Sequence, residues 1–461
     1  MRVLISLLLL LAIVLPAPIV AQAADCQPGT ASGQSLELIE EAFDVLTLMF
    51  VERPAATDIL VPASGAARAQ LAASEEATVP ADDDQAIGDW SSFSTIFCGL
   101  WSTPEELEPT TVSYAAIGAM TQALNEGHTH FMTPKMYDDH KAWQSGDVKY
   151  EGIGARLAGD PLTIQHVFPG SPAEGAGVQF GDRIVAIDGE AAADMRVDEA
   201  VMLIRGEGGT TVELTIERQG VPGTWAVEIA RGTIFIPTIE SRMIGDIAYL
   251  HIDSFPTAEL SSDVLRELQK FRQDNAKALI LDLRDNSGGR LDVGTIIAGY
   301  FLPENTPVYQ QTTRRGQTTT PTSSAGQIWN LPTVVLINDG TASMGEILAS
   351  AMQEGSVATL VGTTTAGEVA GSLVVPLSDG SAVQVTTLRI DSGKGVVLNN
   401  IGVQPDIELV RTIDDVRSGV DDQLEGALTH LRAQLGDTAG PRGANVPNSL
   451  PSREPNAPVV R

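Results

Sequence analysis

The 461-residue sequence predicts a multidomain protein with an α/β fold in its C-terminal half, a β-rich module before it and a helical N-terminal region. Apolar residues recur at helical spacing between positions 35 and 50. Short apolar runs separated by glycine turns fill residues 146–233, and strand-like and helix-like runs alternate from 234 onward. At roughly 150 residues for each domain, this length suggests about two to four domains.

The first 23 residues have the pattern of a signal peptide. A positive Arg2 precedes an apolar run over residues 4–15, and Ala21-Gln22-Ala23 supplies the small residues that signal peptidase requires. The run is short for a membrane span, and no later segment is apolar for long enough to cross a bilayer. We therefore expect cleavage after Ala23 and an exported protein, either periplasmic or extracellular.

The chain has two cysteines, Cys26 and Cys98. Because an exported protein meets an oxidising compartment, one disulfide between them is the simplest expectation. Two unpaired thiols are the alternative.

Residues 24–145 predict a helical region with a flexible insertion. Ile39, Phe43 and Leu46 fall on one face of a helix over 35–50, and a second helix is expected over about 112–124. Between these helices, residues 55–89 are rich in alanine and then acidic. We expect a loosely ordered insertion there.

Residues 146–233 carry the signals of a small β-rich module. Apolar, β-branched runs occur at 162–165, 183–187 and 212–216. Asp188-Gly189 is typical of a tight turn between two strands.

Residues 234–435 predict the α/β core. Strands are expected at 247–252, 278–283, 333–337 and 358–361, and helices at 260–271 and 345–353. The tail over 436–461 is rich in proline, glycine, asparagine and serine, and it predicts disorder.

The formal net charge is −30, with only 29 lysines and arginines. Nucleic acids and anionic membrane surfaces are bound through basic residues, so the composition excludes these partners. We attribute the acidity to solubility.

Two turns of the α/β core carry residues suited to catalysis. A buried strand runs into Asp285-Asn286-Ser287-Gly288-Gly289, where paired glycines let backbone N–H groups approach a ligand, as an oxyanion hole requires. The alternative is a plain turn. A second strand leads through Asn338-Asp339-Gly340 to Ser343 at the start of a helix, where the helix N-terminus favours developing negative charge. The alternative is a serine that only caps its helix. A third strand ends in the glycine-containing loop 362–368, which could face the same site.

In their shared order, these segments resemble the carboxyl-terminal processing, or tail-specific, serine proteases. Residues 245–255 resemble the strand before the catalytic fold, and 282–289 resemble the signature turn. Residues 377–381 and 402–407 resemble the closing segments. The resemblance implies a ClpP/crotonase-like α/β core, with Ser343 as the nucleophile and backbone N–H groups of Gly288, Gly289 and Met344 as oxyanion donors.

The β-rich module resembles a PDZ domain in Tyr150-Glu151-Gly152-Ile153-Gly154, in residues 170–178 and in residues 181–184. A PDZ groove adds a peptide as an extra strand and caps its C-terminal carboxylate with loop N–H groups. The resemblance implies that Gly152, Ile153 and Gly154 form this cap. A module that acts only as a regulatory lid is the alternative.

The sequence departs from the family at the general base. The family's lysine lies 25 residues after the nucleophile, and here that position is Glu368. The supporting glutamine, four residues later, is Ser372. The Ser–Lys pair is therefore absent from its expected place, and a serine hydroxyl is a poor nucleophile without a base.

Three alternatives follow for the base. Tricorn-type peptidases, which the chain also resembles here, use a Ser–His pair with an acidic partner; His128 is our candidate, with His130 as a substitute and Glu368 or Asn399 to orient it. Lys394 is the second alternative. The third is a degenerate protein that binds peptides without cutting them.

We therefore predict an exported serine endopeptidase that hydrolyses peptide bonds, near protein C-termini presented by the PDZ-like module. A catalytically degenerate peptide-binding protein is the alternative. The expected catalytic residues are Ser343, His128 and Glu368. The expected partner is a peptide or unfolded protein, and no metal or other cofactor is expected: His128 and His130 lie only two apart, but no further ligands accompany them.

Overall fold

The computed structural model describes residues 26–27, 29–73, 84–101, 108–145, 149–158, 161–168, 170–193, 195, 197–235, 238–324, 326–411 and 421–436. They divide into two compact units, one formed by residues up to Thr47 and by Pro54–Asn125, the other by Leu48–Arg53 and the chain from Glu126 onward. The predicted signal peptide and the tail from 437 lie outside the described residues. Within the described part, no helix has the length and apolar character that a bilayer crossing needs.

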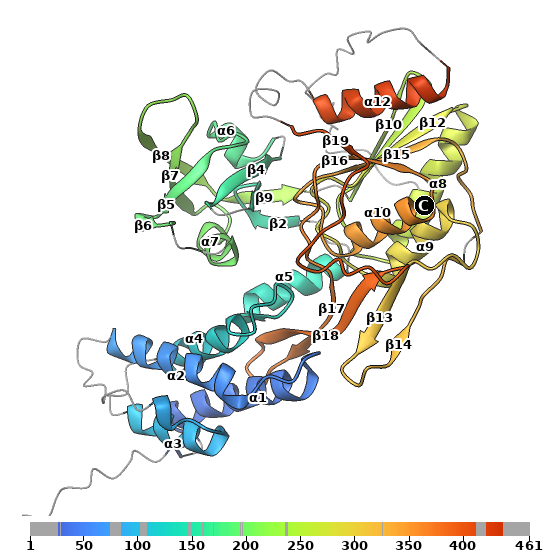
Figure 1. Cartoon of the computed structure of the whole chain (residues 1–461). Helices are drawn as coiled ribbons and strands as arrows, with labels where there is room; N and C mark the ends of the chain where they lie inside the picture. Colours follow the sequence, from blue (N-terminus) through green and yellow to red (C-terminus); the bar gives the residue numbers. More distant parts are fainter. Residues whose placement is uncertain are drawn as a thin grey trace, which may run out of the picture. The chain divides into compact units, whose positions relative to one another are not determined.

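The first unit is helical, as predicted (Figure 1). The expectation of a loosely ordered insertion is wrong for residues 56–72, which form a helix whose small alanine side chains allow close packing against its neighbours. Phe43 and Phe93 both contact the ring of Trp90, and the predicted disulfide joins Cys26 to Cys98. The elements are α1 (Ala31–Met49), α2 (Ala56–Ala72), η1 (Asp84–Ala86), α3 (Trp90–Leu100) and α4 (Pro109–Gln122).

The β-rich module belongs to the second unit and forms an antiparallel sheet in the order β3-β4-β5-β7-β8. Alternate residues of β7 are buried, including Leu214 and Ile216, and they pack with α7 in one apolar core. The elements are β2 (Lys149–Gly152), β3 (Ala155–Ala158), β4 (Thr163–Val167), α6 (Pro172–Gly175), β5 (Arg183–Ile187), β6 (Glu190–Ala191), α7 (Val197–Ile204), β7 (Thr211–Glu217), β8 (Thr224–Ala230) and β9 (Gly232–Phe235).

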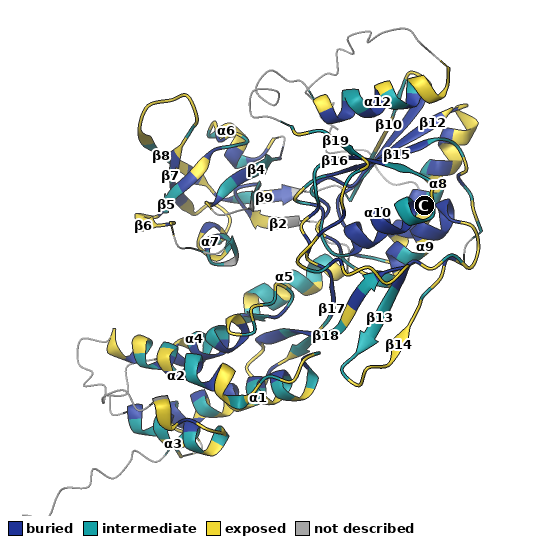
Figure 2. Ribbon diagram, viewed as in Figure 1, coloured by how far each residue is buried: buried dark blue, intermediate teal, exposed yellow. Residues whose placement is uncertain are grey.

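A six-stranded sheet forms the centre of the α/β core, in the order β10-β11-β12-β15-β16-β19. All its neighbours pair in parallel except β10 and β11. Every residue of β12 and β15 is buried, because helices cover both faces (Figure 2). The elements are β10 (Ile239–Ile244), β11 (Ile247–Ile252), α8 (Glu259–Gln273), β12 (Ala278–Asp282), α9 (Leu291–Phe301), β15 (Thr333–Ile337), α10 (Met344–Glu354), β16 (Thr359–Gly362), β19 (Ile407–Glu408) and α12 (Asp422–Gln434).

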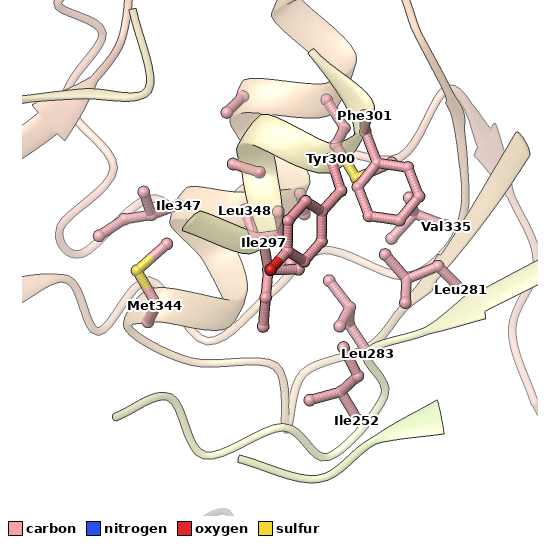
Figure 3. Close-up of a cluster of buried hydrophobic side chains, with 14 of the residues drawn as sticks. Ile252, Leu281, Leu283, Ile297, Tyr300, Phe301, Val335, Met344, Ile347 and Leu348 are labelled. Carbon is pink, nitrogen blue, oxygen red and sulfur yellow. The ribbon is translucent and has the colours of Figure 1, made fainter. Parts of the chain in front are cut away.

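Two apolar layers hold this sheet. Helices α8, α9 and α10 pack on one face, where Ile297 and Leu348 meet Leu281 and Val335 (Figure 3). Helix α12 packs on the other face through Leu424, Leu428 and Leu431. A second, antiparallel sheet contains β1 (His130–Met132), β13 (Tyr309–Thr313), β14 (Thr318–Thr319), β17 (Ala370–Pro376) and β18 (Ala382–Ser392), and α5 (Pro134–Gln144) follows β1.

The parallel register brings three loops to one edge of the central sheet. Asp282 lies beside Leu336, and Ile337 lies beside Gly362, so β12, β15 and β16 end together. The loops that leave these ends are the three that the sequence singled out, at 283–289, 338–343 and 363–369. Ligands of parallel α/β sheets bind at this carboxyl edge.

Candidate active site

Ser343 lies on a strained turn between β15 and α10. Its backbone has φ 52° and ψ −119°, a region that a non-glycine residue rarely occupies and that is typical of an exposed nucleophile on a strand-to-helix turn. Its N–H group has two acceptors, the Glu368 carbonyl oxygen at 2.9 Å and Glu346 Oε2 at 3.0 Å. The fold thus holds a half-buried serine at the N-terminus of a helix.

Of the two glycines of the 283–289 turn, Gly288 lies against Ser343 and Gly289 lies against Phe255. A Cβ atom on Gly288 would lie 2.6 Å from Ser343 Cβ and 3.1 Å from the Met344 nitrogen, so this glycine faces the serine directly. Its N–H group donates to Asn286 Oδ1 at 2.9 Å, so this one of the three expected oxyanion donors already has an acceptor in the structure. The N–H groups of Gly289 and Met344 have no acceptor among the described residues.

Gly289 is held in place from its far side. The Phe255 N–H donates to the Gly288 carbonyl, and the Arg290 N–H donates to the Phe255 carbonyl, each at 2.8 Å. A Cβ atom on Gly289 would lie 2.5 Å from the Phe255 oxygen. Only glycine fits there, so the turn requires both of its glycines.

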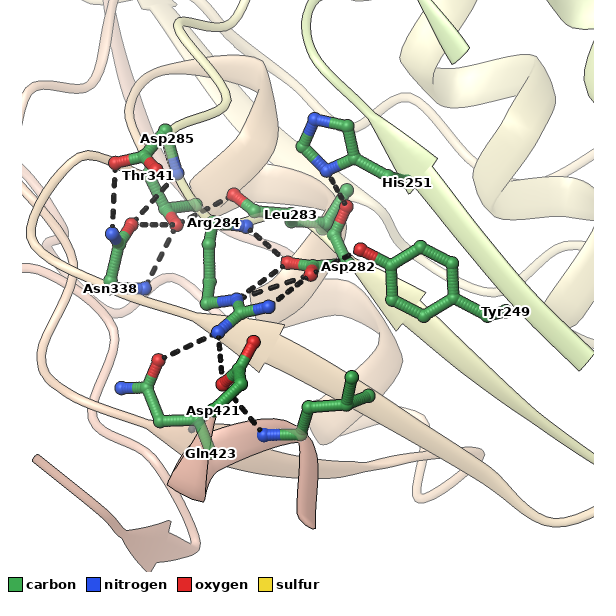
Figure 4. A network of polar contacts seen from close by, with 11 residues as sticks. Tyr249, His251, Asp282, Leu283, Arg284, Asp285, Asn338, Thr341, Asp421 and Gln423 are labelled. Atoms are coloured by element: carbon green, nitrogen blue, oxygen red, sulfur yellow. Dashed lines mark hydrogen bonds and ion pairs between the residues drawn. The ribbon is translucent and has the colours of Figure 1, made fainter. Parts of the chain in front are cut away.

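A buried polar network anchors the start of this turn (Figure 4). Arg284 bonds to both oxygens of Asp282, to Asp421 Oδ1 at 2.8 Å and to Gln423 Oε1 at 3.2 Å. Burial alone would raise the pKa of Asp282, but the Arg284 guanidinium outweighs it and holds that pKa well below its usual range. Burial raises the pKa of Tyr249, whose hydroxyl donates to Asp282 at 2.8 Å.

A second set of side chains joins the 283–289 turn to the nucleophile turn. Asn338 Nδ2 donates to Asp285 Oδ1 at 2.9 Å, and the Asp285 N–H donates to Asn338 Oδ1 at 2.8 Å. The Thr341 hydroxyl donates to the Leu283 carbonyl at 2.8 Å. The sequence placed Asp285 and Asn338 in these two turns but did not predict their bonds to each other or the role of Thr341, although the polar Asn338 directly after a buried strand was a signal.

Glu346 was also missed, and it is fully buried beside Ser343. Its Oε1 accepts from the Thr365 hydroxyl at 2.5 Å and from the Gly367 N–H at 2.8 Å; its Oε2 accepts from the N–H groups of Ser343 and Glu368. Burial raises the pKa of Glu346 above its ordinary value in spite of these bonds. The sequence signal was the Ser-x-x-Glu spacing of a capping box.

Glu368 contributes its main chain to the nucleophile turn, while its side chain is exposed. A Cβ atom on Gly127 would lie 3.6 Å from Glu368 Cδ, so the segment before His128 approaches this loop. Asn399 Oδ1 accepts from the Val369 N–H at 3.2 Å. Among the residues that the structure describes, the ion-pair partner of the His128 ring is neither Glu368 nor Asn399.

The acidic partner of His128 is Glu126. His128 Nδ1 lies 3.3 Å from Glu126 Oε1, close enough for an ion pair but without hydrogen-bond geometry, and the main-chain N–H of His128 donates to the same oxygen at 3.0 Å; both side chains are largely buried. Glu126 Oε2 accepts from the hydroxyls of Thr129 at 2.9 Å and Thr386 at 2.6 Å. Burial would raise the pKa of Glu126, but the hydrogen bonds from His128 and Thr386 outweigh it and lower that pKa to about 2.

The two substitutes for His128 lie elsewhere. His130 begins β1 and pairs with Gln384 of β18. Lys394 Nζ donates to the Glu354 carbonyl at 3.0 Å, at the C-terminal end of α10, whereas Ser343 lies at the N-terminal end. An 11-residue helix is ~16 Å long, so Lys394 is wrong as a base for Ser343.

The expected carboxylate cap lies between β2 and β3 of the β-rich module. Gly152 ends β2, and Ile153 is buried in the module's core. Gly154 has φ 75°, and a Cβ atom there would lie 2.4 Å from Ser171 Cβ. The three residues therefore form a tight loop against the start of α6.

Comparison with known proteins places both modules in families. Residues 246–409 match the model of peptidase family S41, and residues 163–218 match that of the PDZ domain. The chain is 32% identical over 357 residues to the carboxyl-terminal-processing protease of Synechocystis, covering 75% of this chain and 82% of that protein. It is 34% identical over 301 residues to the carboxy-terminal processing protease CtpA of Bacillus subtilis, covering 64% of this chain and 63% of that protein.

The fold also matches a solved structure, that of the photosystem II D1 C-terminal processing protease. The TM-score is 0.60 at 23% identity, covering 82% of this chain and 93% of the other. Together with the relatives in sequence, this establishes that the chain belongs to the carboxyl-terminal processing family of serine peptidases, peptidase family S41, and that it carries a PDZ domain.

Proposed function

We propose that this peptidase is exported and cleaves peptide bonds near the C-termini of substrates, with Ser343 as the nucleophile and His128 as the general base. The observation that carries the proposal is the strained backbone of Ser343, held at the N-terminus of α10 opposite the Gly288-Gly289 turn. A serine in that position can attack the carbonyl carbon of a bound peptide, and backbone N–H groups nearby can donate to the carbonyl oxygen.

The reaction follows the general course of serine acyl transfer. The Ser343 hydroxyl attacks the scissile carbonyl carbon, and its proton passes to His128. The N–H groups of Gly289 and Met344 stabilise the oxyanion, because neither has an acceptor within the described part of the chain. His128 then gives the proton to the leaving amine, and water hydrolyses the acyl-enzyme by the same route.

Glu126 takes the orienting role that the sequence left to Glu368 or Asn399. Its carboxylate lies beside Nδ1 of His128, which directs the other ring nitrogen away from Glu126. Its low pKa keeps it ionised over the whole working range of a peptidase, so it stabilises the imidazolium that forms when His128 takes the proton.

The PDZ domain and the N-terminal segment support the finer parts of the proposal. A PDZ groove binds an extended C-terminal segment, so this domain would present the substrate's end, with Gly152, Ile153 and Gly154 at the carboxylate. The signal-peptide pattern of residues 1–23 supports export to the periplasm or the exterior.

One observation favours a second function, peptide binding without cleavage. Position 368 carries an exposed glutamate where the family pattern has a lysine base. If His128 does not act on Ser343, the protein lacks a base, and a peptide would be bound without being cut.

The test is a peptide-library digest followed by mass spectrometry, with the mature protein, Ser343→Ala, His128→Ala and Lys394→Ala. We expect cleavage by the wild type and by Lys394→Ala only, because Lys394 lies at the far end of α10. Cleavage that survives in His128→Ala would refute the histidine base. Peptide binding without cleavage by any form would establish the second function.

A further inference from the structure

A buried carboxylate joins the nucleophile turn to the loop that carries position 368. The four hydrogen bonds of Glu346 come from Ser343 on one side and from Thr365, Gly367 and Glu368 on the other. We propose that Glu346 is a positioning residue, which holds Ser343 and residues 365–368 as one unit in the geometry that hydrolysis requires. The proposal rests on the assignment of Ser343 as the nucleophile.

Helix capping accounts for only one of these bonds. In a capping box, the N3 carboxylate accepts from the N–H of the N-cap residue, which here is Ser343. The other three donors belong to a loop 19 to 22 residues further along the chain. A carboxylate that only capped α10 would need none of them.

The hydrogen bonds of Glu346 matter because the backbone of Ser343 is strained. A non-glycine residue keeps a positive φ only where its surroundings over-determine it. The N–H of Ser343 is held by Glu346 Oε2 and by the Glu368 carbonyl, and the Glu368 N–H is in turn held by the same Oε2. Glu346 therefore fixes the serine both directly and through the loop, without touching the substrate.

The ionised form is the one that fits. Each carboxylate oxygen accepts two hydrogen bonds, and all four partners are donors. A glutamine would place an NH₂ group opposite two of these donors, so two bonds would be lost and two donors would be left unpaired. Glu346→Gln thus removes the connection with almost no change of volume.

The chain offers a matched control on the same helix. Glu354, at the C-terminal end of α10, accepts from the Ser392 hydroxyl at 2.6 Å and from the Lys394 N–H at 3.0 Å. Glu354→Gln therefore removes a hydrogen-bonded carboxylate of the same type, far from Ser343. A loss that is merely structural should appear in both variants.

The experiment measures the reactivity of Ser343 separately from substrate binding. A small phosphonofluoridate forms an O–P bond with the serine oxygen, fluoride leaves, and the hydroxyl proton passes to the base. Labelling rates are read by intact mass, together with kcat and KM for a cleaved peptide. Since a displacement of about 1 Å costs about 100-fold in rate, we expect that loss in both labelling and kcat for Glu346→Gln, with KM nearly unchanged and Glu354→Gln like the wild type.

Several results would overturn the proposal. Labelling of Glu346→Gln within about threefold of the wild type would do so, as would an equal loss in Glu354→Gln. A crystal structure of Glu346→Gln gives a reading independent of activity: we expect Ser343 to lose its bond to the Glu368 carbonyl, and an unchanged bond and φ would contradict us. Labelling of Ser343→Ala as fast as the wild type would instead refute the nucleophile.

A second pair of variants covers the case in which Glu346→Gln does not fold. Thr365→Val removes one donor to Glu346 and also the acceptor of the Val403 N–H, and Thr365→Ser keeps both. We expect about a tenfold slower labelling for the valine, the worth of roughly one hydrogen bond, and recovery for the serine. A valine variant as reactive as the serine variant would overturn the proposal.

Discussion

Replacing Gly288 with alanine tests the close approach between the glycine turn and the nucleophile. The new Cβ would lie 2.6 Å from Ser343 Cβ, whereas ordinary contacts begin near 3.4 Å. The turn and the serine must therefore separate by about 1 Å, a displacement that costs about 100-fold in rate. Alanine at φ 85° adds about 1–2 kcal/mol of backbone strain.

Gly245 provides the control for the strain alone. It also has a positive φ, of 65°, but a Cβ atom there would meet nothing within 4 Å. We expect Gly288→Ala to lose about 1–3 kcal/mol more stability than Gly245→Ala in urea unfolding, because only its Cβ is overpacked, and only Gly288→Ala to lose about 100-fold in kcat/KM. Activity of Gly288→Ala within threefold of Gly245→Ala would refute the reasoning.

Three further predictions concern stability. The pKa of Glu126 is lowered from 4.5 to about 2, so its ionised carboxylate adds at most about 3 kcal/mol to the free energy of unfolding. This stabilisation is present above pH 4.5 and is lost as the pH falls towards 2. Urea unfolding measured against pH should show the loss in the wild type and not in Glu126→Gln. Arg284→Met leaves Asp282 buried without its ion-pair partner and should cost about 3–5 kcal/mol in the same assay; a loss below about 1 kcal/mol would count against this. Cys98→Ser opens the disulfide to Cys26, which closes a loop of 72 residues, and should lower the unfolding free energy of the first unit by about 4 kcal/mol; an unchanged thermal transition would contradict this.

Four central strands and two helices of the α/β core were predicted from the sequence, because period and apolarity suffice there, whereas α9 and α12 were not predicted. Residues 278–281 and 334–337 are apolar without interruption, which is typical of strands in a sheet covered on both faces. The same reasoning failed for residues 56–72, where alanines gave too little apolar contrast to mark a helix. Their packing against α3 and α4 became visible only in three dimensions.

The site was predictable where a residue's role depends on its neighbours in the chain. Ser343 and Gly288-Gly289 stand at strand ends, and a strand that leads into a glycine turn marks such positions. The partner of His128 was not predictable in this way, since Glu126 and Glu368 are both glutamates near the site and only the fold shows which one reaches the ring. The bond from the Gly288 N–H to Asn286 was not predictable for a similar reason, because it depends on the shape of the turn.

Position 368 shows how the family pattern can lose its lysine without losing the shape of the site. Residue 368 supports the nucleophile turn through its main chain: its carbonyl accepts from the Ser343 N–H, and its own N–H donates to Glu346. Any side chain can supply these two groups, so the glutamate leaves the strained serine in place while its own carboxylate stays in solvent. On our proposal the base therefore comes from another segment, that of His128, which lies beside Glu126 and directly follows Gly127, where the chain approaches Glu368.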